Sequence, residues 1–264
     1  MHHVPSHSKS PDSAQSPVPS ARQRNQIKLG PIQAISGLVF ALFLTLHLAT
    51  AASGILGSAG YDATLTALRR VYRPNLALEL TLIGGSALVH IACAIAQMRR
   101  RGRIVALTGP LWMRAHRASG YFLLLVLIWH VLATRVGPTL ATGPTATGQA
   151  DFAFLAFATL TAPAFFWPYY LMFGIAGSLH LGLGLHLASR MLRRRGVDAG
   201  SDHSPSDKVP ARPPQGAPDT TRRVAILLFT GVVTAGVFSI LWHASDAPRE
   251  RFPEYKALAD RLLR

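Results

Sequence analysis

Four histidines lie deep within long apolar stretches of the sequence, where an ionisable side chain is costly. They are His47, His90, His130 and His180. An ionisable residue inside a membrane-length apolar stretch is a candidate functional group, and neutral imidazole is a good axial ligand for heme iron. A b-type heme is not covalently attached, so the absence of a C-x-x-C-H motif does not argue against it. The four histidines therefore predict heme binding.

A structural explanation competes with this one, because a histidine within a membrane can serve simply as an interhelical hydrogen-bonding group. For any one of the four, the two explanations are about equally good. For four histidines, one in each of four apolar segments and sorted by depth, axial ligation of heme is the better explanation.

The elements that must position these histidines follow from the distribution of charge. Charged residues make up 15% of the 264-residue chain, against about 25% in a typical soluble protein. A helix crosses the bilayer core with roughly 20 apolar residues, so the sequence predicts an all-α membrane protein with five transmembrane helices. The stretches without Asp, Glu, Lys or Arg are 30–61, 80–98, 118–134, 152–189 and 224–245.

The predicted organisation places the histidine sites in one block of four helices. The predicted helices are I (33–55), II (76–98), III (114–136), IV (168–192) and V (223–242). A further apolar segment, 151–161, is too short to span the bilayer and is followed by prolines, so we expect a short interfacial helix. The expected regions are a disordered tail (1–29), helices I–IV with the heme sites (30–195), a polar cytoplasmic linker (196–221), helix V (222–245) and a charged C-terminal tail (246–264).

The basic residues indicate the orientation of the chain. The net charge is +15, but the Lys and Arg residues cluster at the ends of apolar segments, which argues against nucleic-acid binding. With a cytoplasmic N-terminus, 18 of the 27 Lys and Arg residues face the cytoplasm, as the positive-inside rule requires. We therefore expect the N-terminus inside and the C-terminus outside.

This orientation sorts the four histidines by depth. His47 and His130 lie in the later parts of helices that run outward, so they share the outer half of the bilayer. His90 lies ~12 Å from the inner end of its helix, and His180 lies ~15 Å from the inner end of its own. The arrangement predicts an outer pair and an inner pair, which suits two stacked hemes with two histidine ligands each.

Other residues are weaker candidates. His116 and Arg117 open helix III, where they either contact heme propionates or form a plain basic helix start. His186 lies six residues after His180 on another helix face, which favours packing or a hydrogen bond over ligation. Cys93 is the single cysteine, so the chain can form no internal disulfide and no four-cysteine iron–sulfur site of its own.

At these residues the sequence resembles a known family. Residues 33–243 are similar to the five-helix diheme cytochrome b subunits of bacterial succinate dehydrogenases and menaquinol:fumarate reductases. The most specific match is Trp129-His130-Val131 followed by Thr134-Arg135. The other matching segments are Thr45-Leu46-His47-Leu48, Leu76-Ala77-Leu78-Glu79-Leu80, Val89-His90-Ile91 and Ser178-Leu179-His180-Leu181.

The resemblance implies a heme-binding membrane anchor in the bacterial inner membrane. His90 and His180 would hold an inner heme b near an iron–sulfur subunit, and His47 and His130 would hold an outer heme b. Flavoprotein and iron–sulfur subunits would be the partners, with lipid around the helices and a quinone, usually menaquinone, as the substrate near the outer heme.

Glu79 would then be placed to handle the protons of the quinone. Its alternative role is that of an exposed carboxylate favoured at a helix start by the helix dipole. The chain also departs from the family pattern. Some fumarate reductases carry a glutamate two residues before the helix IV ligand, where this chain has Ser178. The N-terminal tail and the 196–221 linker are longer than the family needs.

Two other functional classes stay open. A membrane cytochrome of the ferric-reductase type needs matched histidine pairs on two helices, whereas only helix III carries such a pair, His116 and His130. A transporter or scaffold without heme would use the histidines for proton relay. The sequence has no flavin or dinucleotide fingerprint, so dicarboxylate chemistry would sit on partner chains.

Overall fold

The computed structural model of the chain describes residues 21–73, 75–100, 109–140, 149–200 and 219–262. These residues form helices joined by short connections, without any β-strand. Most of the predicted N-terminal tail and of the predicted linker lies outside the described residues. Helix α1 begins at Ala21, inside the segment that was expected to be a disordered tail.

The helices follow one another with few intervening residues. They are α1 (Ala21–Ala52), η1 (Ser53–Leu56), α2 (Gly57–Tyr72), α3 (Leu76–Leu78), η2 (Glu79–Gly85), α4 (Ser86–Arg100), α5 (Leu111–Val131), η4 (Leu132–Val136), α6 (Gly137–Leu140), α7 (Phe152–Thr161), α8 (Pro163–Gly200), α9 (Thr220–Trp242), η5 (His243–Asp246), η6 (Arg249–Arg251) and α10 (Phe252–Leu262). Segments η2 and η4 are π-helical, whereas η1, η5 and η6 are 3₁₀ helices.

Within the described residues, five helical stretches are long and apolar enough to cross a membrane, which confirms the predicted number of spans. The helix around His180 starts earlier than predicted, at Pro163, and continues through Pro168. A proline removes one backbone hydrogen bond, a loss that membrane helices tolerate. The five stretches are Leu29–Tyr72, Leu76–Arg100, Leu111–Leu140, Pro163–Arg193 and Thr220–Asp246.

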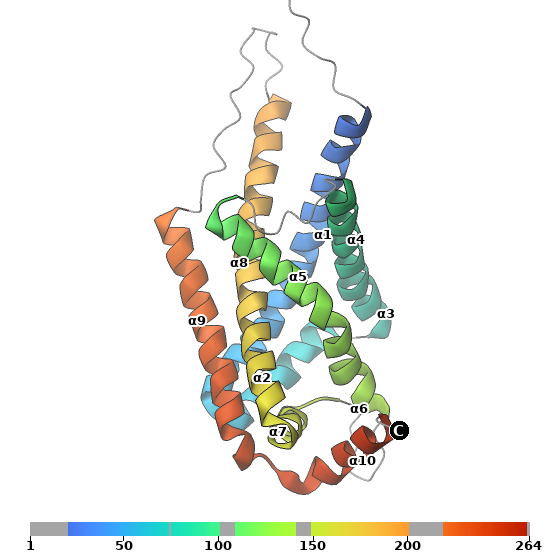
Figure 1. Ribbon diagram of the computed structural model, residues 1–264, viewed down its shortest axis with the longest axis vertical. Helices are drawn as coiled ribbons and strands as arrows, with labels where there is room; N and C mark the ends of the chain where they lie inside the picture. Colours follow the sequence, from blue (N-terminus) through green and yellow to red (C-terminus); the bar gives the residue numbers. More distant parts are fainter. Residues whose placement is uncertain (1–20, 74, 101–108, 141–148, 201–218, 263–264) are drawn as a thin grey trace, which may run out of the picture.

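Four of the spans form two packed pairs that meet through α1 and α8, and the fifth, α9, packs on both α1 and α8 (Figure 1). Helix α4 packs on α1, helix α5 packs on α8, and α1 and α8 pack on each other and on α9. The buried core lies between α1, α8 and α9 and includes Leu48, Leu181 and Val233. By contrast, only 6% of the most apolar window of Leu76–Arg100 and 11% of that of Leu111–Leu140 is buried. Helices α4 and α5 therefore bury little of their surface apart from where they pack on α1 and α8.

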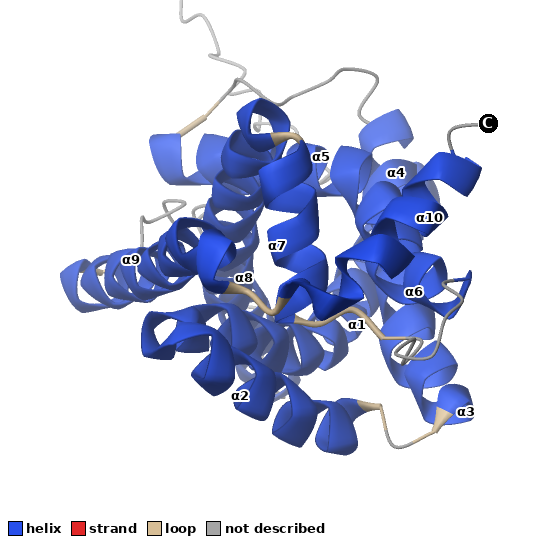
Figure 2. Cartoon of the chain, turned by 90° about the horizontal axis from the view of Figure 1, so that it is seen from below, coloured by secondary structure: helices blue, strands red, loops and turns tan. Residues whose placement is uncertain are grey.

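One end of the bundle is covered by α2, α7 and α10, which we call the cap (Figure 2). The expected short helix at 151–161 is present as α7. The region expected to be a charged tail contains an ordered helix, α10, that packs on α6 and α7. We call the opposite end the arginine end, because the spans there begin or finish in arginines: Arg99, Arg100, Arg114, Arg117, Arg190, Arg193, Arg222 and Arg223.

A polar cluster around Asp151 fastens the cap. The Asp151 carboxylate caps the start of α7 by accepting a hydrogen bond from the Phe154 N–H at 3.0 Å. It also accepts a hydrogen bond from the Tyr255 hydroxyl at 3.1 Å and pairs with Arg251. The neighbouring Phe152 N–H donates to Asp62 of α2 at 3.0 Å. These contacts join three helices that are far apart in the sequence.

Candidate functional site

His47 and His130 face each other near the cap end of the bundle. Their ring centres are 5.9 Å apart, with the planes inclined at 73°. His47 also lies against Phe43, and His130 lies 4.5 Å from Phe173 of α8. We call this pair, contributed by α1 and α5, the cap-side pair.

His90 and His180 face each other nearer the arginine end. Their ring centres are 6.3 Å apart and the planes are inclined at 87°. We call this pair, contributed by α4 and α8, the arginine-side pair. The structure thus brings together the same two pairs that depth along the predicted helices had suggested. Each pair also links the α1–α4 half of the bundle to the α5–α8 half.

The separation within each pair suits a metal ion between two imidazoles. With metal–nitrogen bonds of ~2 Å on either side, the two ring centres come to lie about 6 Å apart. Among the described residues, no group of three or more His, Cys, Asp or Glu side chains could hold a metal ion by itself. Two facing imidazoles could instead serve as the two axial ligands of a b-type heme.

Backbone carbonyls of neighbouring helices anchor both rings of the arginine-side pair. The Nδ1 atom of His90 lies 3.0 Å from the carbonyl oxygen of Gln33, and that of His180 lies 3.2 Å from the carbonyl oxygen of His116. A carbonyl can only accept, so Nδ1 carries the proton and Nε2 keeps its lone pair. Metal-binding histidines commonly have this arrangement, which fixes the tautomer and the ring orientation.

A glycine lies one helical turn beyond each of these carbonyls. A Cβ at Gly37 would lie 2.8 Å from Nδ1 of His90, and a Cβ at Gly120 would lie 2.9 Å from Cε1 of His180. Both separations are shorter than side chains allow. The absence of a side chain at Gly37 and Gly120 therefore lets each ring approach its carbonyl.

The same two helices set the distance between the pairs. In α1, Gly37 contacts the arginine-side pair and His47 follows ten residues later. In α5, Gly120 contacts the arginine-side pair and His130 also follows ten residues later. At ~1.5 Å per residue, both helices place the arginine-side pair and the cap-side pair ~15 Å apart along the bundle.

His116 belongs to the arginine-side site. Its ring stacks on that of His180, with the centres 4.3 Å apart and the planes 11° from parallel. Arg117 follows it in α5 and is near enough to act on His116 electrostatically. The sequence left open whether both residues contact heme propionates or form a plain basic helix start. Residue spacing alone could not reveal that His116 stacks on His180.

This cluster is extended by Trp112, which the sequence did not single out, and by His186, for which the sequence favoured packing or a hydrogen bond over ligation. The rings of Trp112 and His186 lie 5.9 Å apart, and the Arg222 guanidinium contacts Nδ1 of His186 at 3.2 Å. Three buried ring nitrogens here lack a hydrogen-bond partner within the described part of the chain: Trp112 Nε1, His116 Nδ1 and His186 Nε2. A bound group with acceptor oxygens, such as a carboxylate, would satisfy nitrogens of this kind.

Glu79 lies at the cap end, where its carboxylate is held by two arginines. Its distances are 3.0 Å to Arg73 and 2.9 Å to Arg135, and only 18% of its side chain is exposed. The second ion pair joins the two π-helical segments, η2 and η4, and Arg73 is near enough to His47 to act on it electrostatically. Glu79 is therefore not an isolated surface carboxylate, because it belongs to an ionic cluster beside the cap-side pair.

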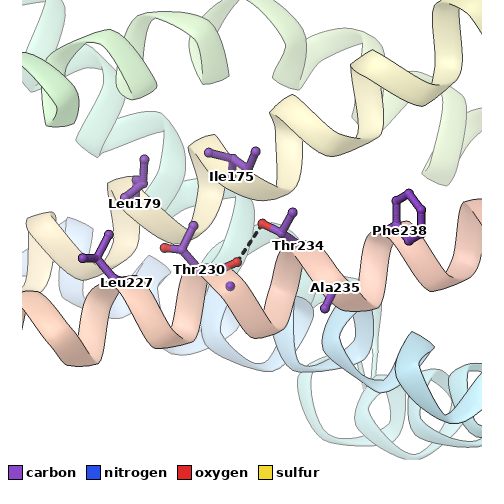
Figure 3. Close-up of a pocket in the computed structure, with 8 residues that line it drawn as sticks. Ile175, Leu179, Leu227, Thr230, Thr234, Ala235 and Phe238 are labelled. Carbon is purple, nitrogen blue, oxygen red and sulfur yellow. Dashed lines mark hydrogen bonds between the residues drawn. The ribbon is translucent and has the colours of Figure 1, made fainter.

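An apolar groove without a histidine in its lining lies between α8 and α9 (Figure 3). Its two threonine hydroxyls are already bonded to backbone carbonyls, Thr230 to Ile226 at 2.8 Å and Thr234 to Thr230 at 2.7 Å. The groove therefore offers apolar surface suited to packing against lipid. Its lining residues are Ile175, Leu179, Leu227, Thr230, Gly231, Thr234, Ala235 and Phe238.

Comparison with known proteins gave no match to a protein family, to a curated protein or to a solved structure.

Proposed function

We propose that the chain is a diheme cytochrome b that carries electrons within the membrane. The observation that supports this most strongly is the pair of facing histidine sites, each built from two different spans with ring centres about 6 Å apart. A ferric-reductase arrangement would place two ligands on each of two helices. Here the four histidines come from four helices, which favours the diheme anchor type.

In this proposal the chain's own residues hold and orient the cofactors. His90 and His180 would hold one heme through Nε2, while the carbonyls of Gln33 and His116 keep their rings in place. His47 and His130 would hold the second heme. Bound heme supplies a one-electron Fe³⁺/Fe²⁺ couple at each level. The ~15 Å spacing along the helices sets how far an electron travels between the arginine-side pair and the cap-side pair.

The unsatisfied ring nitrogens at the arginine end fit the heme that His90 and His180 would hold. Trp112, His116 and His186 would donate to its propionates, with Arg117 and Arg222 supplying positive charge nearby. Propionates buried in a membrane need such partners, because an unpaired buried charge is expensive.

We further propose that the chain is the membrane anchor of a succinate dehydrogenase or fumarate reductase. Its arginine end would face the cytoplasm of a bacterium, as the positive-inside rule favours, and would receive the iron–sulfur subunit, which in turn binds the flavoprotein. The cap would face outward. The cap-side pair would then exchange electrons with a membrane quinone such as menaquinone, and Glu79 would accept or release its protons.

A pyridine hemochrome spectrum of the detergent-purified chain tests the central proposal. We expect about two hemes b per polypeptide, one for each histidine pair. Alanine at His47, His90, His130 or His180 should lower the count to one. Methionine can also ligate heme iron and raises its potential, so His47→Met should retain heme with a shifted midpoint potential.

His243→Ala is the matched control, because His243 is exposed and pairs only with Asp246 within the described structure. It should retain both hemes. A colourless wild-type chain, purified after expression with ample heme, would overturn the proposal and favour a transporter or scaffold. Two hemes in every single-histidine variant would overturn the assignment of ligands.

A further inference from the structure

A line of aromatic rings on α8 connects the lipid-facing surface to the cap-side pair. Phe165 is 62% exposed, and its ring lies 5.8 Å from Tyr169, with the planes 13° from parallel. Tyr169 lies 5.9 Å from Phe173, only 6° from parallel. Phe173 in turn lies 4.5 Å from His130. We call Phe165, Tyr169 and Phe173 the aromatic stripe.

The stripe borders the packed core of the bundle, which it contacts through Tyr169 and Tyr170, whose ring centres are 5.0 Å apart. Its residues are four apart, so they share one face of α8. The core is instead packed by Trp167, Tyr170 and Leu171, which lie on another face of the same helix. Rings that are not needed to fill the core, and that lead to an apolar surface, are available to contact something in the lipid.

The stripe has the chemistry of a platform for a planar redox ring. Aromatic rings attract one another in offset-stacked and edge-to-face arrangements, and the Tyr169 hydroxyl can both donate to and accept from a ring oxygen. The innermost ring, Phe173, contacts His130, which in turn faces His47 at 5.9 Å. An apolar redox ring on this platform would therefore reach the cap-side pair without leaving the lipid.

We propose that the aromatic stripe is the docking surface and electron path for a membrane quinone. The inference rests on the proposed diheme function and names a site for its substrate on α8. A hydroquinone docked there breaks two O–H bonds as it becomes a quinone. Its two electrons would pass one at a time, by way of the cap-side pair, to the two hemes that the histidine pairs would hold, and its two protons would pass through Glu79 to the aqueous phase at the cap end.

The ionic cluster of Glu79 is the competing location for the ring. It also lies beside the cap-side pair, but it belongs to α2, η2 and η4 and offers charge without an aromatic surface. Variants of the two locations therefore separate the alternatives.

The test is the rate at which menadiol reduces the heme of the purified full-length chain, followed by stopped-flow absorbance. Tyr169→Leu and Phe165→Leu each remove a ring and keep an apolar side chain. We expect each to slow the reaction by about 3- to 10-fold, the change that the loss of one aromatic pair supports. Heme content and the extent of reduction by dithionite should stay unchanged.

Two further variants complete the design. Tyr169→Phe keeps the ring and should retain more of the rate than Tyr169→Leu. Phe238→Leu changes an exposed aromatic residue of α9, outside the stripe, and should react like the wild type. Wild-type rates in both leucine variants would overturn the inference. A slow Glu79→Gln variant beside them would then place the quinone at the ionic cluster. A wild-type chain without heme would instead overturn the proposed function.

Discussion

At the scale of single residues, the arginine-side pair shows how a helix surface is shaped to receive a histidine ring. Gly37 and Gly120 remove the side chain that would otherwise cover a backbone carbonyl, and the ring then lies directly on that carbonyl. The oxygen orients the ring and the glycine provides the space.

We therefore predict that Gly37→Ala and Gly120→Ala impair the arginine-side heme. The added Cβ would come within 2.9 Å of a ring atom, so the ring must leave its carbonyl, even though alanine by itself favours a helix by about 1 kcal/mol. Heme counting and redox titration should show one site lost or shifted in potential. Gly231→Ala is the matched control, since a Cβ there meets nothing within 4 Å, and it should leave both sites unchanged.

Residue types and spacing identified the four central histidines, and the structure groups them into the two pairs that depth had suggested. The sequence could not identify the partners of those rings. Gln33 and Gly37 are far from His90 in the chain, and Trp112 and His186 meet only because α5 packs on α8. Such contacts depend on helix rotation, which residue spacing within one helix does not determine.

At the scale of helices, the cap contains a helix that the sequence did not predict. The residues after α9 carry many charges, which indicated a tail. They form α10 because Arg251 and Tyr255 meet Asp151, about a hundred residues earlier in the chain. The five apolar spans and the short helix α7, by contrast, could be predicted from hydrophobic length and proline positions. Hydrophobic length and proline positions do not predict the π-helical segments η2 and η4.

We predict that the attachment of α10 weakens at alkaline pH. Tyr255 is almost fully buried, and burial, followed by the charge of Asp151, raises the pKa of its hydroxyl. An unfolded tyrosine has a pKa of about 10, so the stabilisation is complete below that pH. It is lost as the pH rises towards the higher pKa of the folded state.

Hydrogen exchange of the α10 amides between pH 9 and 11 would measure this effect, after correction for intrinsic exchange rates. Protection should fall across this range in the wild type. In Tyr255→Phe the protection should be lower at neutral pH, because the bond to Asp151 is gone, but it should lack this pH dependence. The same decline in both proteins would show that another group titrates.

At the scale of the whole molecule, the two helix pairs are joined by the contact between α1 and α8 and by α9, which packs on both, whereas α4 and α5 do not take part in this shared core. The two histidine pairs lie where the halves face each other. A cofactor ligated from both sides would therefore hold α4 and α5 in position, where protein packing alone buries very little of their surface. Binding of a ligand to the folded state alone stabilises that state in proportion to its affinity.

We predict that preparation without heme lowers the thermal stability of the chain and loosens α4 and α5 first. Hydrogen exchange should increase in Ser86–Arg100 and Leu111–Val131, with a much smaller change in α9, which packs on the protein core. Adding heme back should restore protection in both helices. Equal loss of protection in α9 would show that the bundle unfolds as one unit.

The ten residues from Gly37 to His47 and from Gly120 to His130 also limit how the chain can vary in length. One residue inserted within either segment would turn the histidine by about 100° around the helix axis and shift it by ~1.5 Å. The ring would then leave its partner. Insertions in the connecting segments would leave both histidine pairs in place. Variation in loop length is therefore compatible with a constant tunnelling distance between the proposed iron centres, whereas insertions or deletions within α1 or α5 are not.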